Sequence, residues 1–171
     1  IQHHVMVTDP VQQPTDELEA TTLTGSSCLV PGQAYQQPVD RLHQLLSCRH
    51  DGLQRIPAQR FEASPQLPVQ HGHFVQGAQL FQPGLFQMSP AETKATDPHH
   101  RLLLQAVYAA SVQAGHSRER LLGSCLGMFL GFCSDSGWGS VQQGSPVTVY
   151  SAHGSGSSAA AGRVSYLFGL K

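Results

Sequence analysis

The residues best suited to covalent chemistry lie in the stretch Gly123-Ser124-Cys125-Leu126-Gly127. A cysteine with a glycine two positions away on each side has the spacing of a turn that exposes a nucleophile between a strand and a helix. Here a charged, helix-like stretch precedes Cys125 and an apolar, strand-like stretch follows it, so the order is reversed. We expect Cys125 to be a buried, unreactive thiol. A small cysteine hydrolase centred on Cys125 is an alternative that thiol alkylation would test.

Ten histidines form the second group of candidate residues, and six of them lie in close pairs: His3-His4, His71-x-His73 and His99-His100. Metal-binding helices place two histidines three or four residues apart, so that both imidazoles share one face. None of the three pairs has that spacing. His71 and His73 could share one face of a strand, but no neighbouring carboxylate or thiolate completes a ligand set. We predict no metal site.

A third candidate is Gly154-Ser155-Gly156-Ser157, which precedes a predicted helix. A helix N-terminus with glycines can bind phosphate. The chain has neither a Walker lysine nor a Gly-x-Gly-x-x-Gly pattern after a strand. A helix cap is therefore the preferred interpretation.

Two helix-start signals follow one another before a long apolar stretch. Ser89 is an N-cap residue followed by Pro90, and Glu92 stands where a capping box places a carboxylate. Asp97-Pro98 is a second N-cap residue followed by proline. Gly115 can adopt the left-handed conformation that ends a helix. The pattern predicts a short helix that leads directly into a longer helix over residues 98–114, with Asp97-Pro98 as the junction.

Strand-like and helix-like stretches alternate along the remaining chain. Thr, Leu, Cys and Val predict a strand within residues 21–30, and helical spacing of apolar residues follows Pro38. We predict a long irregular segment over residues 48–87 and a central strand over residues 126–132. The C-terminal stretch is predicted to form a helix that ends near Phe168. This alternation favours an α/β layered fold.

The composition of the chain restricts the classes of function. A net charge of −1 offers no electrostatic basis for binding nucleic acid or an anionic membrane. No apolar run approaches the ~20 residues that cross a bilayer, and the four cysteines form no Cys-x-x-Cys pair. We expect residues 1–18 to be an N-terminal tail or linker and residues 19–171 to be part of one domain. The location is left open between the cytoplasm and a plastid.

Four stretches follow one another in the order of a known family. Thr24 to Gly32 reads TGSSCLVPG, Gly72 to Pro90 reads GHFVQGAQLFQPGLFQMSP, and Ala159 to Leu170 reads AAAGRVSYLFGL. The fourth runs from Asp97 to Gly115 and begins with the Asp-Pro-x-x-Arg-Leu pattern. Together they resemble the β-ketoacyl synthases, the condensing enzymes of polyketide and fatty-acid synthesis.

This resemblance implies a thiolase-like α/β layered fold, of which the chain would hold the N-terminal, incomplete portion. It implies that the chain has no catalytic residue, because the family's nucleophilic cysteine and two catalytic histidines would lie beyond Lys171. Four matching residues are expected to be structural: Asp97, Pro98, Arg101 and Arg163. Of these, Arg163 would be a fixed ion-pair or hydrogen-bond anchor.

The resemblance also suggests an acyl-binding pocket after the predicted strand. The matching positions are Phe132, Cys133 and Ser134, with ordinary core and loop residues as the equally weighted alternative. His99 and His100 would be polar residues of a first helical turn.

The implied activity of the parent protein is decarboxylative condensation of a malonyl unit with an acyl thioester. Its partner would be an acyl carrier protein, whose phosphopantetheine brings the acyl chain, so no cofactor would be bound directly. The parent would be a homodimer, and the fragment alone would be inactive. The alternative is a non-catalytic scaffold or dimerisation module derived from a ketosynthase.

Overall fold

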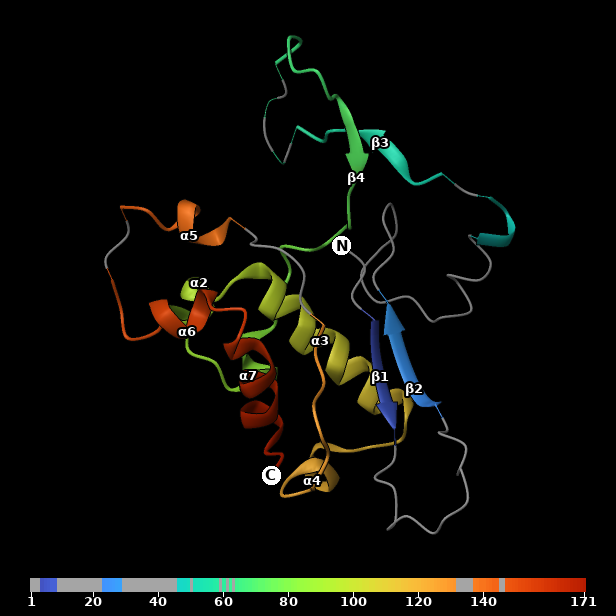
Figure 1. Cartoon of the computed structure of the whole chain (residues 1–171), viewed down its shortest axis with the longest axis vertical. Coiled ribbons are helices and arrows are strands. Elements are labelled where there is room, and N and C mark those ends of the chain that lie inside the picture. The colour runs from blue at the N-terminus through green and yellow to red at the C-terminus, as the bar shows by residue number, and fades with distance from the viewer. Residues whose placement is uncertain are drawn as a thin grey trace.

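The computed structural model describes residues 4–8, 23–28, 46–49, 51–58, 60, 62, 64–131, 137–144 and 147–171 of the 171-residue chain. Figure 1 shows the helices as one group, with a strand pair beside them and a second strand pair standing apart. In chain order, the elements are β1 (His4–Thr8), β2 (Leu23–Cys28), β3 (Leu53–Arg55), β4 (His71–His73), the 3-10 helix η1 (Pro83–Phe86), α2 (Pro90–Ala95), α3 (Pro98–Gln113), α4 (Arg118–Leu121), α5 (Trp138–Val141), α6 (Ser151–Ser155) and α7 (Ala159–Phe168).

The two consecutive helices α2 and α3 begin at the predicted caps. The Ser89 hydroxyl accepts a hydrogen bond from the Glu92 amide, and the Asp97 carboxylate accepts one from the His99 amide. Each bond satisfies one of the amides that a helix start leaves without a partner. Gly115, with φ of 76°, follows the end of α3 in the left-handed region. The predicted succession of a short and a long helix is confirmed.

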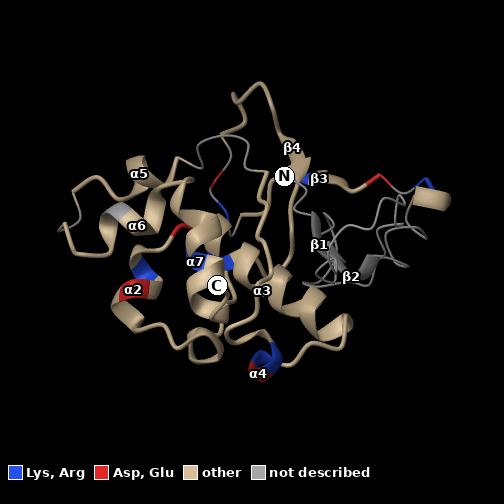
Figure 2. Ribbon diagram, turned by 60° about the horizontal axis from the view of Figure 1, so that its bottom comes forward, with Lys and Arg blue, Asp and Glu red and all other residues tan. Residues whose placement is uncertain are grey.

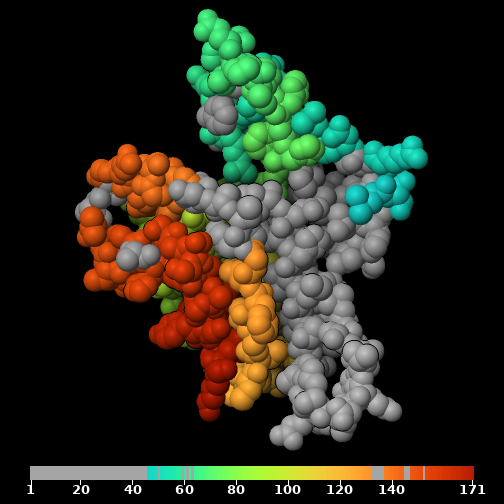
Figure 3. All heavy atoms as spheres, in the orientation of Figure 1, coloured from blue at the N-terminus to red at the C-terminus, as the bar shows by residue number. Residues whose placement is uncertain are grey.

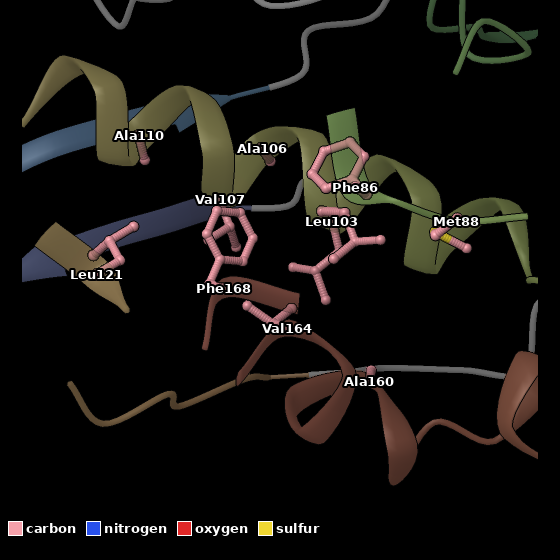
Figure 4. Close-up of a cluster of buried hydrophobic side chains, with 11 residues drawn as sticks. Phe86, Met88, Leu103, Ala106, Val107, Ala110, Leu121, Ala160, Val164 and Phe168 are labelled. Atoms are coloured by element: carbon pink, nitrogen blue, oxygen red, sulfur yellow. The ribbon is translucent and has the colours of Figure 1, made fainter. Parts of the chain in front are cut away.

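Helix α3 is central to the hydrophobic core. It packs against α7 on one side and against β1 and β2 on another, and Leu103 and Leu104 are almost fully buried. Full burial of one such side chain stabilises the fold by about 1.5–3 kcal/mol. Figure 4 shows the side chains that gather between the helices. The cluster consists of Phe86, Met88, Leu103, Leu104, Ala106, Val107, Ala110, Leu121, Ala160, Val164 and Phe168.

Aromatic contacts join the 3-10 helix η1 to this core. The Phe86 ring stacks on Phe81 with centroids 5.3 Å apart, and it meets Tyr108 and Phe168 edge-on at 6.3 Å. Offset stacking and edge-on contacts are the arrangements that aromatic quadrupoles favour. Phe86 therefore links the end of the irregular excursion to both α3 and α7.

The strands in the described ranges form two separate antiparallel pairs. In the first, His4 stands opposite Cys28 and Thr8 opposite Leu23, and β2 lies within the predicted strand. In the second, Leu53 stands opposite His73. Strand β1 lies inside residues 1–18, so this part of the expected tail belongs to the sheet.

The prediction of a central strand over residues 126–132 is wrong for residues 126–131, which are extended but belong to no sheet. Phe132 lies outside the described residues. The side chains nevertheless alternate as they do in a strand. Leu126, Met128 and Leu130 pack against the core, and Phe129 between them is 95% exposed. A strand also needs a neighbour for its backbone, and among the described residues β1 and β2 pair with each other and not with this segment.

Most of the helix predicted after Pro38 lies outside the described residues, which resume at Leu46. Among the helices that the structure describes, none is both long and apolar enough to span a membrane.

Candidate functional site

The Arg163 side chain on α7 makes several hydrogen bonds around the joint, which we define as Thr96-Asp97-Pro98 between α2 and α3. Its Nη1 lies 3.0 Å from Oε1 of Glu92 and 3.4 Å from Oγ1 of Thr96. Its Nη2 donates to the carbonyl of His153 at 2.9 Å. The Arg163 side chain is only 9% exposed. A single guanidinium thus connects α7 to α2, the joint and α6, which suits its planar fork of donors.

A close backbone contact reinforces the joint. The Asp97 amide donates to the carbonyl of Gly154 at 2.7 Å. A Cβ atom added to Gly154 would collide with the Ala95 carbonyl. Helix α6 can approach the joint this closely because residue 154 has no side chain.

Two titratable groups follow the joint on α3. Burial lowers the pKa of His100, with the Arg163 and His99 charges acting in the same direction and the Asp97 carboxylate opposing them. Burial also lowers the pKa of Arg101, again against the effect of Asp97. Desolvation disfavours the charged form of both groups. His100 is therefore held in its neutral form, whereas a guanidinium stays protonated at neutral pH.

A surface hollow of about 210 Å³ lies between α2, α5 and α6. Its lining includes Ala95, Trp138, Gln142, Val147 and Ser151. The Trp138 indole donates to the carbonyl of Ala95 at 3.1 Å, and the Gln142 side-chain amide donates to the carbonyl of Lys94 at 3.5 Å. These bonds hold α5 against the end of α2, so the hollow contains packing contacts and no charged lining group.

The expectation that Cys125 is buried is wrong, because its side chain is exposed. It lies on the outward side of the extended segment, where residues alternate between exposed and half-buried positions. The short helix α4 precedes it and extended chain follows, which is the reverse of a nucleophile turn. Within the part of the chain that the structure describes, no hydrogen bond joins Cys125 to a base.

The predicted acyl-pocket residues Phe132, Cys133 and Ser134 lie outside the described residues. The structure does place the four residues predicted to be structural. Asp97 and Pro98 form the joint, Arg101 is half-buried in the first turn of α3, and Arg163 reaches the joint from α7.

The histidine pairs do not form a metal site in the described ranges, where no three potential ligands come together. His73 lies 3.5 Å from Asp51, a carboxylate that the sequence analysis did not consider, and both side chains are mainly exposed. Among the described residues, α2 and α4 each carry both acidic and basic positions, and α7 carries a basic one (Figure 2).

Figure 3 shows the exposed surface of the same elements, with α7 and the extended segment after α4 side by side on one face.

Two further features of the site were missed by sequence reasoning. Glu92 was expected to complete a capping box, but its carboxylate pairs with Arg163, 71 residues away. His100 was expected to be a polar residue of the first turn, but it is 1% exposed. The helical period contained this signal, because position 100 shares a face with Leu103 and Leu104.

The sequence model of the family described as "Beta-ketoacyl synthase, N-terminal domain" matches residues 19–171. The chain belongs to the β-ketoacyl synthase family. Among curated relatives, it is 29% identical over 169 residues to a phenolphthiocerol/phthiocerol polyketide synthase of Mycobacterium tuberculosis, covering 92% of the chain and 9% of the relative. It is 33% identical over 168 residues to the polyketide synthase GfsB of Streptomyces halstedii, covering 90% of the chain and 3% of that protein.

Solved structures give the same family at the level of the fold. The ketosynthase from module 6 of the bacillaene synthase of Bacillus subtilis 168 superposes with a TM-score of 0.68 at 25% identity, over 86% of this chain and 24% of that one. A ketosynthase domain of Streptomyces albus JA3453, OzmH KS7, superposes with a TM-score of 0.66 at 23% identity, over 86% of this chain and 27% of that one.

These ketosynthase neighbours confirm the thiolase-like α/β fold, of which the described residues form a partial, mixed helix and sheet portion. The chain spans less than a tenth of the polyketide synthases named above and about a quarter of the bacillaene ketosynthase.

Proposed function

We propose that the chain is the N-terminal part of the ketosynthase domain of a longer synthase that condenses malonyl units with acyl thioesters. The observation that carries the proposal is the family match over residues 19–171. The relatives named above include polyketide synthases, and the pathway of the parent protein is either polyketide or fatty-acid synthesis.

The chemistry of the parent would be covalent catalysis by a cysteine outside this chain. In that scheme, a thiolate takes the acyl group from the phosphopantetheine thioester of a carrier protein and releases the pantetheine thiol. Histidines then promote loss of CO2 from the malonyl unit and stabilise the enolate, whose carbon attacks the acyl-enzyme. The described part of this chain contributes a scaffold in which Arg163 and the joint fix α7 relative to α2 and α3.

Several finer features belong to the same proposal. The partner is an acyl carrier protein, the whole synthase is a homodimer, and the family domain covers residues 19–171, with β1 of the preceding stretch paired to β2. By the resemblance to the family, Phe132, Cys133 and Ser134 would line the acyl pocket.

The test is a condensation assay with acyl- and malonyl-carrier protein. The whole protein should release CO2 and form a β-ketoacyl product, while the 171-residue chain should form none above the blank. Product from the 171-residue chain would contradict the proposal that the catalytic cysteine and histidines lie outside this chain. A whole protein that folds and dimerises but forms no product would favour the non-catalytic scaffold or dimerisation module.

A further inference from the structure

The two-stranded ribbon of β3 and β4 has two different faces. Exposure alternates residue by residue over residues 51–55 and again over residues 69–73, which is the repeat of a β-strand. Gln54 and Gly72 stand opposite each other on the inner face. The Phe74 ring covers this face, because it would lie 3.1 Å from a Cβ atom added to Gly72. The outer face is open to solvent and carries Asp51, Leu53, Arg55, Val69, His71 and His73.

The register of the ribbon brings a guanidinium and an imidazole together on the outer face. Arg55 stands directly opposite His71, and Leu53 stands directly opposite His73. Residues that are directly opposite in an antiparallel pair have Cβ atoms about 4.5–5.5 Å apart. The side chains of Arg55 and His71 can therefore reach the same small ligand.

The two histidines of the outer face differ in their acidic neighbours. Nε2 of His73 lies 3.5 Å from Oδ1 of Asp51, and the same oxygen accepts a hydrogen bond from the Leu53 amide at 2.9 Å. Among the described contacts, neither Arg55 nor His71 has an acidic partner. Like charges that face each other across two strands repel, and an anion bound between the two side chains would remove that repulsion.

We propose that Arg55 and His71 bind the phosphate group of a phosphate monoester whose organic part is apolar. A guanidinium donates two parallel hydrogen bonds to phosphate oxygens, and a charged imidazole adds a further charge-assisted bond. Leu53, 50% exposed, and Val69, 65% exposed, lie on either side of the two cationic residues along the ribbon. They give the organic part an apolar contact. This inference goes beyond the proposed condensation and does not depend on it.

The charge of the ligand follows from the charge of the two side chains. A phosphate monoester carries a charge of about −1.5 to −2 at pH 7, which matches a guanidinium together with an imidazolium. A carboxylate or a sulfate ester carries a single charge and leaves one of the two cations without compensation. The outer face should therefore prefer the phosphate monoester.

The position of the ribbon makes substitutions on its outer face informative. β3 and β4 stand apart from the group of helices (Figure 1), and the side chains of both cationic residues are exposed. Substitution of exposed residues away from the core usually changes the free energy of unfolding little. A loss of binding in these variants will therefore report on the ligand contact and not on the fold.

Titration of the 171-residue chain with phenyl phosphate, followed by backbone amide NMR shifts, tests the proposal. The shifts should concentrate on β3 and β4, with a dissociation constant of about 1 mM for two exposed charge-assisted contacts. Phenyl sulfate has the same ring but a single charge, and it should bind about fivefold more weakly or less. Equal affinity for the two compounds, or shifts that avoid the ribbon, would overturn the proposal.

A matched pair of arginine variants separates the specific contact from general attraction. Arg55→Gln should weaken the binding of phenyl phosphate about tenfold, because it removes the guanidinium fork. Arg60→Gln removes the same charge nearby, but the Arg60 guanidinium donates to the Val75 carbonyl at 3.0 Å. This variant should bind within about twofold of the natural chain. Equal losses in both variants would contradict the assigned contact, and their amide spectra show whether each is folded.

The pH dependence of binding tests the imidazole. The charged or titratable groups on the face of His71 are Arg55, His73 and Asp51. Imidazoles gain charge as the pH falls through about 6.5, whereas phosphate monoesters lose their second charge only below about pH 6. Phenyl phosphate should therefore bind about threefold more tightly at pH 6.3 than at pH 8.0.

The histidine variants identify which imidazole is responsible. His71→Gln should abolish the difference between the two pH values, and His73→Gln, one step along the same strand, should keep it. A difference that persists in His71→Gln and disappears in His73→Gln would overturn the assignment of the phosphate to Arg55 and His71.

A peptide arm distinguishes the two sources from which such a phosphate could come. An extended peptide with one phosphotyrosine and uncharged neighbours is compared with phenyl phosphate. Binding of the peptide about tenfold more tightly would support a phosphorylated protein, and equal binding would support a small phosphate ester. Binding of the unphosphorylated peptide with the same affinity would overturn the proposal.

Discussion

At the scale of single residues, Arg163 is the side chain through which α7 holds α2, the joint and α6. It is largely buried and bonds to Glu92, Thr96 and the His153 carbonyl. Arg163→Met should lower the free energy of unfolding by about 1–3 kcal/mol, because the partly exposed Glu92 and His153 acceptors and the buried Thr96 hydroxyl lose a shared donor. Urea denaturation followed by circular dichroism measures this loss.

Arg163→Lys is the control for charge. A lysine keeps the positive charge but cannot present a planar fork to several acceptors, so its loss of stability should be smaller than that of Arg163→Met. Equal stability of the methionine variant and the natural chain would show that the network contributes nothing.

His100 should make stability depend on pH in the mildly acidic range. Burial lowers its pKa in the folded state below the ordinary value of about 6.5, so the unfolded chain binds the proton more readily. The free energy of unfolding therefore falls as the pH drops below about 6.5, and this fall ends once the pH is below the folded-state pKa of His100.

The comparison variant for this pH effect is His100→Gln, which cannot titrate. The difference in urea midpoint between pH 7.5 and pH 5.5 should be smaller in this variant than in the natural chain. The same pH dependence in both proteins would assign the effect to other groups.

At the scale of elements, the approach of α6 to the joint depends on one missing methyl group. Gly154→Ala would push a Cβ against the Ala95 carbonyl and should destabilise the fold by about 1–3 kcal/mol. Gly162 on α7 is the matched control, since nothing lies within 4 Å of an added Cβ there.

Gly162→Ala should instead stabilise the chain by about 0.5–1 kcal/mol, because alanine loses less entropy than glycine in a helix. Thermal unfolding of the two variants side by side measures both effects. A change of the same sign in both would contradict the close contact between α6 and the joint.

Elements with local signals were predictable from the sequence, and elements that need distant partners were not. Ser89 and Asp97 cap α2 and α3 through bonds to amides two or three residues away, so the sequence contains the whole interaction. Residues 126–131 have the apolar pattern of a strand, but strand formation depends on a neighbour that no local pattern supplies.

The same distinction applies to the candidate site. The ion pair of Arg163 with Glu92 crosses 71 residues, and capping rules could assign only a local role to Glu92. The burial of His100 was accessible from the period of α3, since it shares the face of Leu103 and Leu104. The exposure of Cys125 depends on which side of the extended segment faces the core.

At the scale of the whole molecule, exposed apolar side chains should make the isolated chain associate. Phe129 is 95% exposed, Val147 92% and Tyr166 84%, and apolar surface that gathers into large patches favours contacts between molecules. Sedimentation velocity should show larger species as the protein concentration rises.

Phe129→Lys should weaken this association, because it adds a charge to the unpaired segment. The same substitution at Val112, which is 55% exposed at the end of α3, is the control. It shows how far replacing any one exposed apolar residue weakens association. A sharp, concentration-independent thermal transition of a monomer would contradict the prediction.

The 71-residue separation between Glu92 and Arg163 has a consequence for biosynthesis. At about 5–20 residues per second, translation delivers the arginine several seconds after its acidic partner. During that interval the nascent helix α3 presents leucines that α7 will later cover. We expect the ribosome-bound chain to recruit chaperones that shield apolar segments until the guanidinium emerges.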